Sequence, residues 1–320
     1  MPTAVPPTRH APSHPLDGLT VLERGWLSSN NLLVHVAPGE DGALLVDSGH
    51  VNHAAQTLAL VQQALQGTPL TRLVNTHLHS DHCGGNASLQ RAHGVVVAIP
   101  PGQADAIAAW DDAALSYAAT GQRIEAFRHQ QLLQPGEPLV AGGVEWQVLA
   151  APGHDPHSVM LFEPRRGLLV SADALWEHGF GVVFPEVQGE PGFDDVGQVL
   201  DQIAALPVKL VVPGHGAPFT DVAAALTRAR ARLAAFRADP AKHARHALKV
   251  LVKYHLMEER QQPLAALLDW AEATPLVQTS GRLHPPPAAA GGTRAWLQGL
   301  VMELVDSGAL ARDGDLVLDR

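Results

Sequence analysis

The chain has 320 residues, 46% of them hydrophobic, and its 22 Lys plus Arg against 32 Asp plus Glu give a formal net charge of −10. A chain of this length buries a sizeable core in one large domain or two unequal ones. The acidic balance argues against a protein that binds nucleic acid over its whole surface, although a local basic patch remains compatible with it. The single cysteine, Cys83, excludes an internal disulfide and favours a reducing compartment.

The first residues are rich in proline and lack the apolar run of a signal peptide. No stretch approaches the ~20 consecutive apolar residues of a membrane span. We therefore expect a flexible arm over residues 1–16, no membrane segment and a cytoplasmic location.

From residue 19 the sequence shows short apolar runs separated by glycine and proline, a pattern typical of strands. The runs lie at 19–23, 32–36, 43–46, 73–75, 95–99, 144–149, 158–162, 168–170 and 210–212. Helical patterns lie at 53–66, 86–93, 102–109, less regularly up to about 129, and at 194–205. Two strand-rich blocks, each followed by helices, predict an α+β fold with two facing sheets and helices outside, an αββα sandwich over residues 17–220.

The pattern changes after residue 220. Helices are predicted at 222–237, 242–257, 263–270 and 294–307, with a Pro/Gly/Ala loop at 281–292. A small hairpin follows, with Gly314 between 310–311 and 316–318. Helices followed by a two-stranded wing indicate a winged-helix-like module over residues 221–320. Its many apolar residues predict that it packs against the rest of the protein.

The most informative motif is THLHSDHCGG at residues 76–85, just past a strand. Alternate residues of a turn can point to the same side, so His77 and His79 can share one metal ion while Asp81 and His82 face a second. The two glycines permit close backbone approach and positive φ where the next helix begins.

Three further metal-competent residues also directly follow apolar strands: His154 in PGH, Asp173 in SAD and His215 in PGH. A polar loop that is histidine-rich by chance does not account for them. Seven ligands divide into two sites of three, plus one shared carboxylate. Sites with three protein ligands leave room for water, which is typical of catalytic metal centres. Nitrogen and oxygen donors without a thiolate favour two Zn²⁺ ions, with iron or manganese as alternatives.

These motifs, in this order, resemble the metallo-β-lactamase superfamily over roughly residues 19–220. The resemblance implies two ligand sets and a bridge: His77, His79 and His154; Asp81, His82 and His215; and Asp173 between them. It also implies that Asp47, in LVDSG, orients the metal-binding loop. True zinc β-lactamases generally lack the bridging acid, whereas the glyoxalase II, lactonase and nuclease branches have one. Antibiotic hydrolysis is therefore not the expected role.

The first functional hypothesis is a hydrolase that uses a metal-bridging hydroxide on a small ester or thioester, similar in chemistry to glyoxalase II. Asp81 is expected to orient the nucleophile as well as bind metal. The glutathione-binding basic and tyrosine positions of glyoxalase II cannot be identified, since Tyr117 and Tyr254 are the only tyrosines. Nothing in the sequence indicates the oligomeric state.

The alternative is an endoribonuclease or phosphodiesterase whose C-terminal module binds nucleic acid, as in some relatives with a winged helix. Residues 227–260 contain nine Lys or Arg against three acidic residues, an excess of six positive charges. Such a run is more often a solvated helix face, and the ester hypothesis is favoured. A third hypothesis is a non-catalytic protein that senses metal or binds a partner. Seven intact ligands argue against it, because such a protein does not require the full set.

Four other features of the sequence are candidates for a functional role. Cys83 is interpreted as a small packing residue rather than a ligand, and His157 as either a rim residue or a plain loop histidine. Asp155 stands where many relatives of the family have threonine, so local hydrogen bonding is expected to differ. Residues 175–190 are either a hydrophobic flap on the core or a wall of the substrate pocket.

Overall fold

The computed structural model describes residues 14–287 and 291–320. Residues 1–13 of the expected arm therefore lie outside the described residues. The last residues of the arm form a turn in which the Asp17 amide donates to the His14 carbonyl (3.1 Å). Leu16 of this turn packs against the hydrophobic core that lies between the two sheets described below. None of the described helices is long and apolar enough to cross a membrane.

The first sheet has six strands in the order β1-β2-β3-β4-β5-β6. Strands β1, β2 and β3 pair antiparallel, and β3 to β6 pair parallel. The bounds are β1 Leu19–Leu22, β2 Asn31–Val34, β3 Ala43–Val46, β4 Leu70–Val74, β5 Val96–Ile99 and β6 Gln131–Leu132. The sequence pattern missed β6, because it has only two residues and both are exposed.

The second sheet has the order β11-β10-β9-β8-β7. Only β10 and β11 pair parallel. The bounds are β7 Pro138–Ala141, β8 Val144–Ala150, β9 Val159–Glu163, β10 Leu168–Ala172 and β11 Leu210–Pro213. The pattern missed the edge strand β7, which begins at a proline and has two exposed residues of four.

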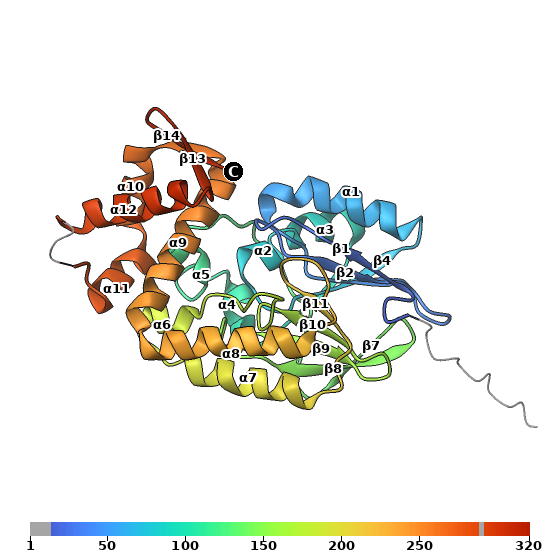
Figure 1. The fold of residues 1–320 in the computed structure, drawn as a ribbon. Helices are drawn as coiled ribbons and strands as arrows, with labels where there is room; N and C mark the ends of the chain where they lie inside the picture. Colours follow the sequence, from blue (N-terminus) through green and yellow to red (C-terminus); the bar gives the residue numbers. More distant parts are fainter. Residues whose placement is uncertain (1–13, 288–290) are drawn as a thin grey trace, which may run out of the picture.

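The two sheets face one another, and helices cover their outer faces (Figure 1). Side chains alternate along each strand, so Leu32 and Leu44 enter the core between the sheets while Leu33 and Leu45 face the outer helices. Helices α1 (Ala54–Leu65) and α3 (Asn86–His93) cover the first sheet. Helices α7 (Phe193–Ala205) and α8 (Val222–Ala238) cover the second. The predicted αββα sandwich is confirmed.

Shorter helices connect these layers: η1 Val51–His53, α2 Ser80–Cys83, η2 Pro101–Gln103, α4 Ala104–Ala109, α5 Ser116–Thr120 and α6 Phe184–Gln188. The expectation of helix up to about residue 129 is wrong beyond α5, because Gly121 ends that helix in a left-handed conformation (φ +68°).

The last part of the chain forms helices α9 (Pro240–Glu259), α10 (Leu264–Ala273), α11 (Pro275–Leu283) and α12 (Thr293–Asp306). Strands β12 (Gln261–Pro263), β13 (Leu310–Asp313) and β14 (Leu316–Asp319) form a third sheet in the order β12-β14-β13. These elements share a separate hydrophobic core built around Leu248, Leu267 and Leu300.

Two details of this region differ from the sequence interpretation. The loop expected from residue 281 begins only after Leu283, because Pro275 starts the unforeseen helix α11; residues 288–290 of that loop lie outside the described residues. The wing has a third strand, β12. Helix α8 packs on the second sheet rather than in the C-terminal core. The division into 17–220 and 221–320 stays a prediction.

Candidate metal centre

The seven candidate ligands lie at one edge of the sandwich because each follows the carboxyl end of a strand. His77, His79, Asp81 and His82 follow β4, His154 follows β8, Asp173 follows β10, and His215 follows β11. Backbone hydrogen bonds join the two sheets at this edge, from the Val159 amide to the Thr76 carbonyl (2.8 Å) and from the Asn30 amide to the Gly214 carbonyl (2.7 Å). Strands that meet at one edge thus bring together residues up to 138 positions apart, from His77 to His215.

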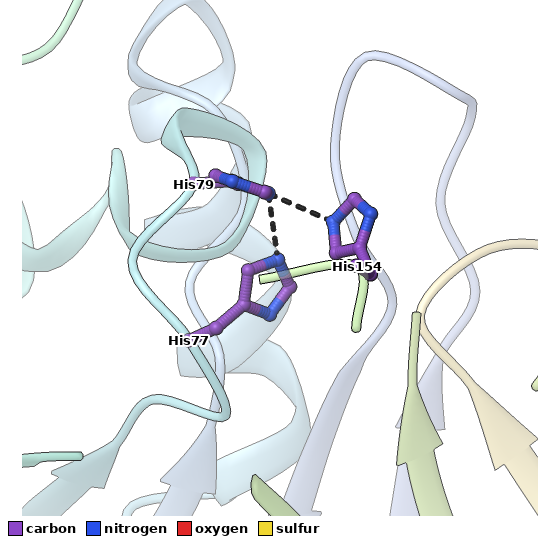
Figure 2. Close-up of side chains that lie close together, drawn as sticks. All are labelled: His77, His79 and His154. Carbon is purple, nitrogen blue, oxygen red and sulfur yellow. Dashed lines mark hydrogen bonds between the residues drawn. The ribbon is translucent and has the colours of Figure 1, made fainter. Parts of the chain in front are cut away.

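His77, His79 and His154 form the first group (Figure 2). His79 Nδ1 lies 3.1 Å from His77 Nε2 and 2.8 Å from His154 Nε2, and the candidate ligand atoms all lie within 4.8 Å of one another. All three side chains are buried. The spacing places three nitrogen donors around one small volume.

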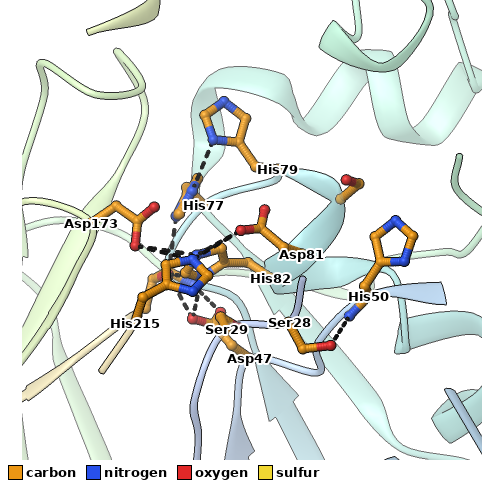
Figure 3. Close-up of polar contacts among 12 residues, drawn as sticks. Ser28, Ser29, Asp47, His50, His77, His79, Asp81, His82, Asp173 and His215 are labelled. Atoms are coloured by element: carbon orange, nitrogen blue, oxygen red, sulfur yellow. Dashed lines mark hydrogen bonds and ion pairs between the residues drawn. The ribbon is translucent and has the colours of Figure 1, made fainter. Parts of the chain in front are cut away.

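Asp81, His82, Asp173 and His215 form the second group (Figure 3). His215 Nε2 lies 3.0 Å from Asp81 Oδ2, and His82 Nε2 lies 3.4 Å from Asp173 Oδ1. This group combines two imidazoles with two carboxylates, a donor set suited to a divalent transition metal.

Asp173 lies between the two groups. Its Oδ1 faces His82, while its Oδ2 lies 3.3 Å from His154 Nε2 in the first group. A register shift between Val170 and Ala172, with Ala172 at φ +46°, turns the chain before this aspartate. Gly214 is required opposite, because a β-carbon there would lie 2.1 Å from Asp173 Oδ1.

Contacts behind the ligands fix which nitrogen faces the centre. Asp47 Oδ2 lies 2.8 Å from His82 Nδ1, and the same carboxylate accepts from the Thr76 amide and hydroxyl, both at 2.8 Å. The Val182 carbonyl lies 2.6 Å from His154 Nδ1. Carboxylates and carbonyls in this position orient metal-binding imidazoles through the distal nitrogen. The contact of Asp47 agrees with the orienting role implied by the resemblance.

The surroundings of His79 and Asp81 favour the protonation states in which these side chains bind a metal, a neutral imidazole and an ionised carboxylate. Burial first, and then neighbouring His154, lower the pKa of His79 to about 4. Burial raises the pKa of Asp81, but His82 and His215 outweigh it and hold the pKa at about 2. The pKa of His82 is raised despite burial, because the carboxylates of Asp47 and Asp173 favour a positive charge at that point.

One buried ring nitrogen without a hydrogen-bond partner indicates that a metal ion fits the second group. Among the described residues, His82 Nε2 is buried and has no hydrogen-bond partner, although Asp47 occupies the other nitrogen of the same ring. Leaving such an atom unpaired costs free energy. A cation placed among the four ligand atoms of the second group would satisfy it.

A cleft of about 570 Å³ opens above both groups. Trp26 and Trp176 flank its mouth: Trp26 stacks on His215 with ring centroids 5.3 Å apart, and Trp176 meets the same ring edge-on at 5.5 Å. The Trp176 indole also donates to Asp173 Oδ1 (3.1 Å). No pattern in the sequence indicated Trp26, which is 57% exposed and precedes the first motif.

The opposite side of the cleft is the helical wall, which we define as Arg232 of α8, the α9 residues His246, Lys249, Val250, Leu251, Lys253, Tyr254 and Met257, and Leu304 of α12. The segment 175–184 completes it through Glu177, His178, Phe180, Gly181, Val182 and Phe184. Leu175, Phe180 and Val183 of that segment are also buried in the sandwich core. The segment is therefore both a flap on the core and a pocket wall.

Helix α9 also contacts the metal-binding loop directly, a role that the sequence did not indicate. The Tyr254 hydroxyl lies 2.7 Å from Ser80 Oγ, between His79 and Asp81 in the chain. Glu258 Oε1 lies 2.9 Å from His50 Nε2, and both side chains are buried. No motif or periodicity separates these two residues from the rest of a buried helix face.

The remaining sequence-selected residues lie outside the ligand groups. Cys83 is buried in the core, donates to the His79 carbonyl, and has a pKa raised by burial, so it acts as a packing residue. His157 is exposed and its ring lies against Gly102. Asp155 is buried with Oδ2 3.7 Å from His79 Nε2, a contact that the departure from threonine makes available.

Comparison with known proteins agrees with this geometry. The sequence model of the metallo-beta-lactamase superfamily matches residues 24–215. A hydroxyacylglutathione hydrolase from Xanthomonas euvesicatoria pv. vesicatoria is 31% identical over 198 residues, which are 62% of this chain and 65% of that protein. One from Rhodobacter capsulatus is 31% identical over 147 residues, 46% of this chain and 48% of that protein. The chain thus spans less than two thirds of these relatives.

Two solved structures resemble the whole fold. A metallo-beta-lactamase family protein from Thermus thermophilus has a TM-score of 0.56 at 20% identity, covering 95% of this chain and 99% of that one. A beta-lactamase domain protein from Burkholderia ambifaria has a TM-score of 0.55 at 20% identity, covering 98% and 97%. At this identity the likeness concerns the fold alone, and its coverage includes the C-terminal elements.

Proposed function

The chain belongs to the metallo-beta-lactamase superfamily, and from this premise we propose that it is a binuclear metal-dependent hydrolase of an ester or thioester. The observation that supports the proposal most directly is the position of Asp173. One of its oxygens faces the three-histidine group and the other faces His82 and His215. A carboxylate with an oxygen directed at each group is suited to join two ions in one centre.

We propose His77, His79 and His154 as ligands of one ion, and Asp81, His82 and His215 as ligands of the other. Two Zn²⁺ ions fit the nitrogen and oxygen donors, and iron or manganese are alternatives. Bound metals supply Lewis acidity, which activates water near neutral pH and polarises the acyl oxygen.

The protein's own groups then position the reactants. Asp81, ionised because its pKa is about 2, can accept a hydrogen bond from the attacking water and so orient it toward the acyl carbon. Asp47 and the Val182 carbonyl hold the His82 and His154 rings in place from behind. The apolar side chains of the cleft, such as Phe184 beside His79 and His154, reduce competing water.

The curated relatives named hydroxyacylglutathione hydrolase support thioester chemistry for this site. The nuclease alternative gains no support from the basic run at 227–260. Seven of its nine cationic side chains bond to groups within the protein: Arg228, Arg230, Arg237, Arg245, Lys249, Lys253 and Arg260. A surface that binds a polyanion needs cations free to contact phosphates.

The test is a substrate panel on protein of known metal content. After reconstitution with zinc or with manganese, elemental analysis should find close to two ions per chain. The protein should then hydrolyse thioesters or esters faster than phosphodiesters or single-stranded RNA. One ion or none would contradict the binuclear centre, and cleavage of RNA alone would replace the proposed reaction with the nuclease alternative.

A further inference from the structure

Apart from the candidate metal ligands, the lining of the cleft is largely apolar. The side chains that line it include Phe180, Val182, Val250, Leu251, Met257 and Leu304. Such a surface suits a hydrocarbon body better than a peptide with several charges, because burying an unpaired charge is costly. The lining therefore favours an apolar substrate and makes each polar exception informative.

Arg232 is the exception on α8. Other arginines of this helix are bonded: Arg228 to the Glu177 carbonyl (2.7 Å), Arg230 to Asp201 (2.7 Å) and Arg237 to Asp194 (2.6 Å). Arg232 lines the cleft, is half-buried, and has no hydrogen-bond or ion-pair partner among the residues that the structure describes. Burial alone lowers its pKa, with no carboxylate opposing that effect.

The guanidinium of Arg232 is held by packing. It lies against the backbone of Gly179, where a β-carbon would come within 2.5 Å of Nη1 and 2.7 Å of Cζ. The φ of +133° at Gly179 is also one that side-chain-bearing residues rarely adopt. A guanidinium fixed in this way loses little freedom when it binds a planar anion.

The other titratable groups that line the cleft near Arg232 do not pair with it, because they have partners of their own or are neutral. Lys249 pairs with Glu303 (2.5 Å), and Lys253 pairs with Asp319 (2.5 Å). Glu177, the acid of the adjacent segment, contacts His178 (3.8 Å). His246 has a pKa lowered to about 4, chiefly by burial and then by Arg232 and Lys249, so it is neutral near pH 7.

We propose that Arg232 binds a carboxylate on the substrate, so that the preferred substrate is an apolar ester or thioester with a single negative charge remote from the scissile bond. The inference rests on the proposed hydrolase function and adds to it the class of substrate. A guanidinium presents a fork of N–H donors that matches a carboxylate in two parallel hydrogen bonds. The apolar lining then accommodates the chain between that carboxylate and the acyl carbon.

The test compares matched thioesters in the metal-loaded protein. One pair differs on the acyl side, a hexanoyl thioester against the adipoyl monothioester of the same thiol. A second pair differs on the thiol side, the hexanoyl thioester of propanethiol against that of 3-mercaptopropionate. The pair with the larger difference shows which side carries the carboxylate. The variants are Arg232→Gln, Arg232→Lys, and Arg230→Gln as a control on the same helix outside the cleft.

Wild-type protein and Arg230→Gln should prefer one carboxylate-bearing thioester. Arg232→Gln should raise its KM roughly 10- to 100-fold, the loss expected for a charged hydrogen bond, and leave the uncharged partner within about twofold. Arg232→Lys should recover part of the preference. Equal loss for charged and uncharged thioesters, or no loss for either, would overturn the assignment of Arg232.

Calorimetry separates this inference from the hydrolase proposal. The probes are thioether analogues of the two carboxylate-bearing thioesters, which have no scissile acyl bond, each with either the free carboxylate or the corresponding primary amide. The wild type should bind at least one carboxylate form at least tenfold more tightly than Arg232→Gln does, with the amide unaffected. If no thioester is cleaved but this difference is seen, only the reaction is wrong. If binding is equal in both proteins, the role of Arg232 is wrong.

Discussion

The two sides of the cleft are built in different ways. The candidate metal ligands follow the ends of four strands and belong to short motifs in which neighbouring residues face the same centre. The helical wall comes from α8, α9 and α12, and its residues are scattered along helices with no shared motif. Chemistry is therefore concentrated where the backbone geometry of strand ends fixes it, whereas the wall depends on how long helices pack.

The two sides also differ in what constrains them: backbone conformation at the strand ends, and side-chain contacts along the helices. At the strand ends, unusual backbone conformations are part of the site, as at Asp47 (φ +57°) and Ala172 (φ +46°). Such conformations persist only where surrounding contacts compensate for them. The helices of the wall have ordinary backbone. They contribute through side chains such as Tyr254, which reaches the metal-binding loop at Ser80, and Glu258, which reaches His50 in the loop after β3.

The largest effect is expected on the ligand side. Asp173→Ala removes the carboxylate between the two groups and should lower the metal content toward one ion per chain. The catalytic rate should fall by more than about 100-fold, because altering even the contacts behind a ligand costs 10- to 100-fold. Elemental analysis and the rate on the preferred substrate provide the measurement. Asp201→Ala, at an exposed position of α7, is the control, and near-full activity of Asp173→Ala would contradict the bridging role.

A loss of stability is expected where α9 meets the loop after β3. Glu258→Ala leaves the buried His50 Nε2 without its hydrogen-bond partner, and an unsatisfied polar atom in the interior costs about 1–3 kcal/mol. The neighbouring variant Glu259→Ala breaks only a partly exposed pair with Arg123 and should cost at most about 1 kcal/mol. Chemical unfolding measures both. Similar losses for the two variants would show that α9 does not support the loop through Glu258.

The ligand side could be predicted from the sequence because its motifs are short and local. His77, His79, Asp81 and His82 fall within six residues, and each distant ligand follows a strand and a small residue. Strand ends that share an edge bring such residues together whatever the details of packing. The sheets and outer helices were predicted for a similar reason, since their apolar periodicity records burial.

The wall could not be predicted in the same way. The periodicity of α9 shows that one face is buried, but it does not distinguish burial in a core from a position facing a cleft. Arg232 illustrates the limit, because it lies in a run of arginines and lysines that looks uniform in sequence. Only the packing of α8 against Gly179 sets it apart. Strand β12 and helix α11 were missed because each is short and contains proline.

A smaller effect is expected from pH. His243 of α9 is buried with its Nε2 accepting from the Val183 amide, and burial lowers its pKa to about 4. The unfolded chain, with an ordinary histidine pKa near ~6.5, binds more protons than the folded chain between these values. This contribution should leave stability unaffected above about pH 6.5 and reduce it as the pH falls toward 4.

The substitution His243→Gln tests this contribution, since glutamine supplies an acceptor but does not titrate. Between pH 6.5 and 4.5 the wild type should lose about 1 to 2 kcal/mol more unfolding free energy than the variant does. Urea unfolding of both proteins at each pH gives the difference, which removes the acid sensitivity that they share through the metal centre. Parallel pH curves would exclude His243 as the source.

The smallest effect compares two tyrosines that support the same loop from opposite sides. Tyr117 of α5, within the sandwich, donates to the Leu78 carbonyl (2.8 Å), whereas Tyr254 of α9 bonds Ser80 Oγ (2.7 Å). Ser80 also bonds Gln122 Oε1 (2.8 Å), so it keeps a partner when Tyr254 is changed. Tyr254→Phe should therefore cost only about 1 kcal/mol, the net value of one hydrogen bond.

Tyr117→Phe should cost more, because it takes away the donor to a buried carbonyl rather than one of two bonds to a hydroxyl. A polar group left unsatisfied in the interior costs about 1–3 kcal/mol, so the two variants should differ by about 1 kcal/mol. Unfolding free energies measure this difference, and chelator competition measures the affinity for metal, which should follow the same order. If Tyr254→Phe proved the more damaging, the metal-binding loop would depend on the helical wall more than on the sandwich, and the contrast between the two sides of the cleft would be reversed at this point.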